Sequence, residues 1–166
     1  MGRYQVLPEL SRVWAEARSS LHPIRVETAG FEGEIEAETL EAGIRLAPPT
    51  RISLPVALLK SSNALVDAEL KRKLDARRFP RITGELREGS APAGGRSLLR
   101  GVLTLHGVSR EMEVEVAVRA AEGDALEVEG EKVIDMRDFD LVPPRFLIFK
   151  VEPLVRVRAK LVARAV

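Results

Sequence analysis

The chain has 166 residues, of which 45% are hydrophobic and 31% charged, proportions typical of a soluble globular domain rather than a disordered segment. Its 26 basic and 25 acidic side chains leave a formal charge of +1, so no overall field attracts nucleic acid or an anionic membrane. It contains no cysteine and two histidines, which excludes disulfides, thiolate nucleophiles, zinc–thiolate sites and a three-histidine metal centre. The length predicts one domain, residues 1–166.

Segments in which apolar and polar residues alternate occupy most of the chain, and Gly, Pro or Ser bounds them. Such alternation predicts strands that turn one face toward a core. In chain order the segments are 11–18, 24–29, 31–38, 51–58, 81–87, 97–106, 112–119, 125–134 and 155–161. About eight strands at this spacing predict an all-β fold, an antiparallel sandwich or barrel.

The segment 64–78 departs from this alternation. Its apolar residues recur at every fourth position, with charged residues between them: Val66, Leu70 and Leu74. This spacing predicts one amphipathic helix inserted among the strands. Ser62 or Asn63 can cap its first turn, and Phe79-Pro80 ends it. We expect the helix to cover a sheet edge or to close one end of a barrel.

Small residues are frequent on the inward faces of the predicted strands. Because side-chain direction alternates along a strand, an inward Val13 also turns Ala15 and Ala17 inward. An eight-stranded barrel either packs solid or holds one small ligand, and small inward residues favour a hollow. We expect these residues to line the cavity: Val13, Ala15, Ala17, Ile24, Val26, Phe31, Gly33, Ile35, Val114, Val116, Val118, Val155, Val157 and Ala159.

The side chains that could act in catalysis or bind a metal are not spaced in the sequence as either role requires. His106 precedes a glycine in a predicted tight turn, where it either ties down the backbone or contacts a ligand head group at the barrel mouth. The glutamates at 32, 34, 36 and 38 form a row along one strand, whereas a cation site needs carboxylates that converge on a point. We expect a solvated face, paired across strands with Arg156, Arg158 and Lys160. No catalytic residue, metal or cofactor is predicted.

The densest positive cluster lies on and after the predicted helix and comprises Lys71, Arg72, Lys73, Arg77, Arg78 and Arg81. As a solvated helix face it needs no ligand. It would also suit contact with a membrane surface or with the pyrophosphate of a prenyl lipid. Both interpretations stay open at the level of the sequence.

The segment Leu103-Thr104-Leu105-His106-Gly107-Val108-Ser109-Arg110-Glu111-Met112-Glu113-Val114 resembles the signature of the YceI-like family. That signature is a strand, a His-Gly-Val turn followed by Ser or Thr, a basic residue and a second strand. Weaker similarity covers residues 4–17, 30–35, 54–82 and 139–157, so it spans nearly the whole chain. The resemblance implies a lipocalin-like antiparallel barrel that binds polyisoprenoids or other amphiphiles.

This sequence departs from the family pattern at positions that bear on the ligand. Leu7 and Leu10 stand where the family usually carries an Asp and a His, and Glu69 stands where its helix usually carries a His. The resemblance therefore implies the family fold, with head-group contacts that differ from those of its relatives.

The leading hypothesis is non-enzymatic binding, carriage or storage of a long-chain isoprenoid or other amphiphilic lipid in the barrel. A solid-packed interaction barrel is the first alternative, and inward small residues that face large ones across the barrel would favour it. A small cavity enzyme is the second, and it would need His106 beside a carboxylate inside the cavity. Nucleic-acid binding is not expected, and a homodimer is left open. Because residues 1–9 lack the apolar run of a secretory signal, we expect a cytoplasmic protein, although many members of the family are exported.

Overall fold

The computed structural model describes residues 1–143, 145–146 and 149–166. The strands are β1 (Gly2–Val6), β2 (Arg12–Ser19), β3 (Ile24–Thr28), β4 (Glu32–Leu40), β5 (Gly43–Pro55), β6 (Arg81–Gly89), β7 (Ser97–Leu105), β8 (Val108–Ala121), β9 (Ala125–Asp135), β10 (Arg145–Phe146) and β11 (Phe149–Ala165). The helices are η1 (Pro8–Leu10), η2 (Val56–Leu58), α1 (Ala64–Lys73) and η3 (Met136–Phe139), of which only α1 is an α-helix. No described helix is long and apolar enough to cross a bilayer.

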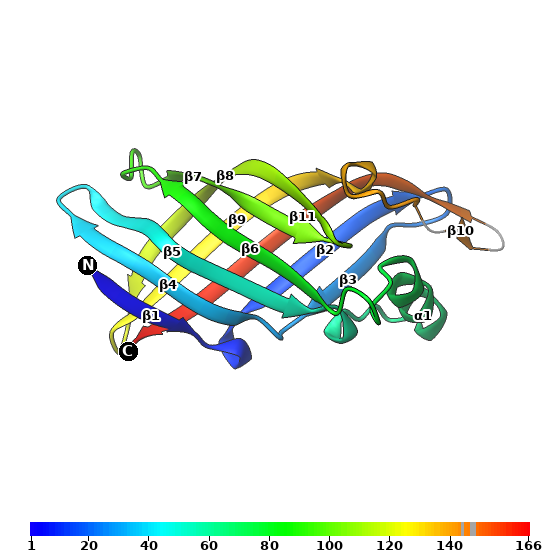
Figure 1. The fold of residues 1–166 in the computed structure, drawn as a ribbon, viewed down its shortest axis with the longest axis horizontal. Helices are drawn as coiled ribbons and strands as arrows, with labels where there is room; N and C mark the ends of the chain where they lie inside the picture. The colour runs from blue at the N-terminus through cyan, green and yellow to red at the C-terminus, as the bar shows by residue number, and fades with distance from the viewer. Residues whose placement is uncertain (144, 147–148) are drawn as a thin grey trace.

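Antiparallel pairing closes the sheet into a barrel (Figure 1). The ring has the eight strands β1, β4, β5, β6, β7, β8, β9 and β11, and the β1–β11 pairing closes it. The β2–β3 hairpin extends the barrel wall beyond this ring, because β2 pairs with residues 151–160 of β11 whereas β1 pairs with residues 163–165. The predicted all-β barrel is confirmed.

Ser11 holds the bend between β1 and β2, which lets both strands share the same edge of β11. This serine is fully buried. Its hydroxyl donates to the Leu7 carbonyl oxygen at 2.8 Å and accepts from the Val162 amide at 3.0 Å. The Leu7 amide in turn donates to the Val162 carbonyl oxygen at 2.8 Å. The side chain thus replaces the ladder hydrogen bond that the bend removes.

The predicted strand at 51–58 is wrong at both ends, because β5 begins at Gly43 and gives way to η2 after Pro55. The first half of β5 was not predicted because it contains Pro48 and Pro49. Prolines lack the amide hydrogen that a strand donates to its neighbour, so they normally argue against a strand. At this point the β4–β5 register shifts, and the Thr50 hydroxyl accepts from the Glu36 amide at 2.9 Å. The side chain thus bonds to the neighbouring strand where the regular ladder is interrupted.

Helix α1 covers the end of the barrel that lies away from the two chain termini (Figure 1). Asn63 caps it, its side-chain oxygen accepting from the Leu65 and Val66 amides at 2.8 and 3.3 Å. The predicted span of 64–78 is too long, because Asp75 adopts a left-handed conformation with φ of 51° directly after the Leu74 cap. That conformation ends the helical hydrogen-bond pattern.

The barrel interior differs between its two ends. Near the termini it is filled by side chains packed in the buried core, among them Val6, Ala37, Leu126 and Ala163. These residues come from β1, β4, β9 and β11, whose pairing closes the ring there. Toward α1 the interior is hollow, and this hollow is the candidate site.

Candidate ligand cavity

A cavity of about 450 Å³ occupies the α1 end of the barrel. Side chains from β2 through β9, from β11 and from α1 line it, and nearly all of them are apolar. The helix contributes Val66, Leu70 and Leu74, the residues whose spacing predicted it. A volume of this size lies within the range of small-molecule sites. A solid-packed interior, the first alternative from the sequence, does not fit this end of the barrel.

The structure places all but two of the residues predicted to line the cavity on its wall. Those on the wall are Val13, Ala15, Ala17, Ile24, Val26, Phe31, Ile35, Val114, Val116, Val155, Val157 and Ala159. The sheet register explains their shared direction, because Ala15 pairs with Val26 on one side and Val157 on the other. Their role in binding a ligand stays a prediction.

Gly33 and Val118 do not line the cavity, which corrects the prediction for these two positions. A Cβ at Gly33 would lie 2.1 Å from the Arg51 carbonyl oxygen, and φ there is +149°, so glycine permits a close approach of β5. Its register partner Ile52 lines the cavity at this level. Val118 packs against the buried core beyond the cavity, because β8 is longer than the hollow that it borders.

Several lining residues were not among those predicted. They lie on β5, β6, β7 and β9 and include Ile52, Leu54, Ile82, Leu86, Leu99, Leu103 and Val128. The same apolar–polar alternation marked these strands, so the signal was present in the sequence. The one cation on the wall, among the residues described, is Lys132. The alternation of the predicted strand 125–134 places it on the same face as Val128, but it was not among the predicted lining residues.

His106 is held in the β7–β8 turn rather than on the cavity wall. It adopts a left-handed conformation (φ 56°), and its Nδ1 lies 3.1 Å from the Phe139 carbonyl oxygen. Its ring packs edge-on against Phe79 with centroids 5.4 Å apart. Gly107 follows at φ 71°, where a Cβ would lie 2.5 Å from the same phenyl ring. These contacts fit the backbone-tying interpretation, and the predicted head-group contact has no support in this geometry.

The acidic row on β4 is a solvated, ion-paired face, but its predicted partners are wrong. Glu32 pairs with Arg81 at 2.9 Å, Glu36 with Arg3 at 3.1 Å, and Glu38 with Arg45. The reason is topological, because β4 lies between β1 and β5 rather than beside β11.

The basic residues of β11 that were expected to pair with this row have other partners. Arg156 pairs with Glu131 at 3.2 Å and Lys160 with Glu127 at 3.4 Å. Arg158 lies over the Trp14 ring at 4.6 Å from its centroid. All three basic residues therefore act on the outer face of β11, on the side away from the cavity.

Three carboxylates have pKa values below their ordinary range. Hydrogen bonds from Arg72 lower the pKa of Glu69, and those from Arg137 lower the pKa of Asp135. Burial is the largest influence on Asp67 and raises its pKa, but two hydrogen bonds from Ser61, at 2.6 and 2.7 Å, outweigh it and the net pKa is lowered. These shifts favour charged carboxylates rather than a proton donor for catalysis. In the described part of the chain, no cluster of His, Asp and Glu could hold a metal ion.

The basic cluster at residues 71–81 is partly neutralised. Arg72 pairs with Glu69 at 2.6 Å, Arg78 with Asp75 at 3.5 Å, and Arg81 with Glu32. None of its members lines the cavity. The cluster is therefore the outer, solvated face of the segment whose apolar side chains cover the hollow.

Comparison with known proteins agrees with this architecture. The chain matches the model of the YceI-like domain family over residues 4–163. Its fold is similar to that of Burkholderia cenocepacia BcnA, with a TM-score of 0.79 and 18% identity over 95% of this chain and 98% of that one. It is also similar to a polyisoprenoid binding domain from Saccharophagus degradans that is implicated in plant cell wall breakdown, with a TM-score of 0.76 and 14% identity over 100% of both chains.

A third similar structure is the Campylobacter jejuni YCEI protein, with a TM-score of 0.67 and 14% identity over 85% of this chain and 84% of that one. At such identities the similarity to solved structures concerns the fold alone. None of the curated protein sequences matches this chain.

Proposed function

The chain belongs to the YceI-like domain family, and from that premise we propose that it binds and carries a long-chain amphiphile, a polyisoprenoid or similar lipid, inside its barrel. The observation that carries this proposal is the cavity of about 450 Å³ at the α1 end, with its nearly continuous apolar wall. Polar side chains on the wall are few, so the cavity suits a hydrocarbon tail far better than a polar substrate.

The energetics of burying a tail support the same ligand class. Transfer of a hydrocarbon chain out of water gains about 0.8 kcal/mol per methylene, so about 15 carbons gain roughly 12 kcal/mol before costs. Association costs at least about 4 kcal/mol in lost freedom. A short tail would therefore bind weakly, whereas a prenyl or acyl chain of this length can bind tightly without a single polar anchor.

Carriage without chemistry fits the site better than catalysis. Glu36 and Glu131 form ion pairs on the outer faces of strands, and His106 is hydrogen-bonded within a turn. A similar solved structure, from Saccharophagus degradans, is called a polyisoprenoid binding domain, which agrees with carriage. We extend that class to this chain as part of the proposal.

Native mass spectrometry of the gently purified protein tests the proposal, with organic extraction of whatever is bound. We expect a stoichiometric long-chain amphiphile, or uptake of one when the empty protein is incubated with polyprenyl phosphates or fatty acids. A protein that stays empty after both incubations would refute the proposal. It would favour the alternative hypothesis of a barrel that interacts with a partner and holds no ligand.

A further inference from the structure

The barrel wall parts between β8 and β9. Ladder pairing between these strands runs only from Val116–Gly130 to Ala121–Ala125. Over the described residues beyond Val116 and Gly130, β8 pairs only with β7, and β9 pairs only with β11. Gly130 stands where the two strands separate, and a Cβ there would approach a Val116 methyl to 2.9 Å.

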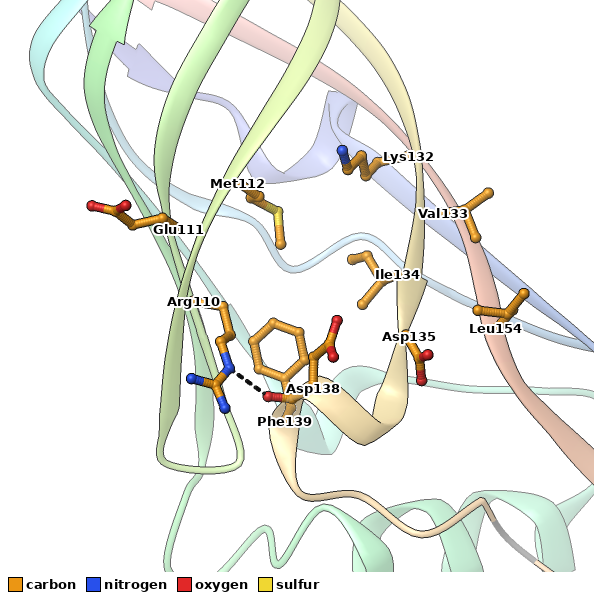
Figure 2. A pocket seen from close by; sticks show the side chains of 10 residues that line it. All are labelled: Arg110, Glu111, Met112, Lys132, Val133, Ile134, Asp135, Asp138, Phe139 and Leu154. Carbon is orange, nitrogen blue, oxygen red and sulfur yellow. Dashed lines mark hydrogen bonds between the residues drawn. The ribbon is translucent and has the colours of Figure 1, made fainter.

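The space between the separated strands is a lateral opening of about 390 Å³ (Figure 2). Met112 from β8 and Ile134 from β9 point toward each other across it, and Phe139 of η3 lies below them. Met112, Lys132 and Ile134 line both this opening and the apolar cavity. The opening therefore lies beside the cavity, on the flank of the barrel.

Lys132 occupies an inward position on β9. In the β9–β11 register it pairs with Val157, and its inward neighbours Gly130 and Ile134 pair with Ala159 and Val155. All of these residues line the cavity. Since paired residues point to the same face, the lysine stem enters the apolar interior with them. Figure 2 shows its side chain directed from β9 into the opening.

Four acidic residues lie near Lys132, since Glu111, Asp135 and Asp138 line the opening with it and Glu131 lines the cavity. Two of these acids have other partners, because Glu131 pairs with Arg156 at 3.2 Å and Asp135 pairs with Arg137 at 2.7 Å. Glu111 points away from the opening in Figure 2. Asp138 lies at its lower rim, with its carboxylate directed upward beside the Phe139 ring in Figure 2, and its backbone oxygen accepts from Arg110 Nε at 2.7 Å. Throughout the described chain, no ion pair involves Lys132.

We propose that Lys132 binds the anionic head group, a phosphate or a carboxylate, of the amphiphile whose tail fills the cavity, with the head group lying in the lateral opening. This inference rests on the proposed function and specifies the charge of the ligand's head group and the orientation of the ligand in the barrel. An ammonium group at the edge of an apolar cavity is costly unless water or an anion reaches it. The opening admits water when the barrel is empty, and an anionic head group takes the place of that water when it is filled.

The experiment compares ligands that share a tail and differ in the head group. Geranylgeranyl phosphate is paired with geranylgeraniol, and palmitate with hexadecanol, in titrations of the full chain by native mass spectrometry. Lys132→Met removes the charge while keeping an apolar side chain of similar length. Lys160→Met is the matched control, because Lys160 lies on the outer face of β11, paired with Glu127 at 3.4 Å.

We expect Lys132→Met to weaken binding of the phosphate, the carboxylate or both by about tenfold to a hundredfold, the effect of losing one charge-assisted hydrogen bond. Binding of the matching alcohols should be unchanged, and Lys160→Met should change neither. The anion that loses affinity identifies the head group.

Each of three other results would overturn the inference. Wild-type protein that binds neither alcohols nor anions would refute it together with the proposed function. Wild-type binding of both, with Lys132→Met indistinguishable from it, would refute the role of Lys132 alone. Equal losses for alcohols and anions, in a variant with a wild-type circular dichroism spectrum, would assign Lys132 to packing.

Discussion

Filling the cavity from β2 is the sharpest test of where a tail would lie. Ala15 and Ala17 both face the hollow, and they lie opposite Val157 and Val155 of β11. A phenylalanine at either position therefore projects into the space that the tail is proposed to occupy. Because the cavity is open at these positions, the ring has room that a packed core would deny it.

The expected loss of affinity follows from the carbons displaced. A phenyl ring adds six carbons and excludes about six carbons of the tail, which costs about 5 kcal/mol at about 0.8 kcal/mol each. That energy is more than a thousandfold in Kd for one ring. Ala15→Phe with Ala17→Phe should therefore abolish uptake of a long-chain amphiphile, while Ala15→Phe alone should weaken it by about a thousandfold.

The assay is binding of geranylgeraniol and palmitate by native mass spectrometry, with circular dichroism to show that each variant is folded. Arg18→Phe is the matched control, because it adds the same ring to the exposed outer face of β2. Its binding should equal that of the wild-type protein. Wild-type affinity in the folded double variant would refute the placement of the tail beside β2.

Three further predictions concern stability. Gly107→Ala should lower the melting temperature more than Gly94→Ala, because both glycines have positive φ but only the Cβ at Gly107 meets a phenyl ring; equal losses would contradict the clash. Ser11→Ala should cost about 1–3 kcal/mol of unfolding free energy in urea titrations, because it leaves a buried amide unpaired. Ser90→Ala, at an exposed serine that also accepts an amide, should cost less, and equal costs would argue against burial as the cause. The pKa of Asp67 is lowered in the folded state, so its stabilisation is present above about pH 4 and is lost as pH falls through the lower folded value. Asp67→Asn should flatten the acid decline of the melting temperature, and an unchanged decline would refute this linkage.

The shared inward direction of the β2 side chains has a local cause. In an extended chain, side chains two residues apart point to the same face. The sequence is therefore sufficient to predict that Ala15 points in the same direction as Val13. Gly33 shows the limit of this rule. Its register partner lines the cavity, but the close approach of the β5 backbone takes up the place where its side chain would be.

Lys132 was not among the residues that the sequence analysis assigned to the cavity. Alternation from Leu126 and Val128 places Lys132 on the inward face and Glu131 on the outward one, but a lysine is normally expected on the solvent face. The structure places Lys132 on the cavity wall beside Val157 of β11, a residue more than 20 positions away in the chain. The gap beside it arises because β8 and β9 no longer pair beyond Val116 and Gly130. Where two strands stop pairing depends on the arrangement of all the strands in the barrel.

By itself the sequence determined the strand pattern, the presence of one amphipathic helix and the apolar character of the inward faces, because each depends on neighbours a few residues apart. The tertiary structure alone decided which strands are adjacent, and so which arginines pair with the β4 glutamates. It also decided that one end of the barrel is packed and the other hollow, with a lateral opening at Lys132. An empty volume is a property of side chains brought together from the whole chain, and no local period encodes it.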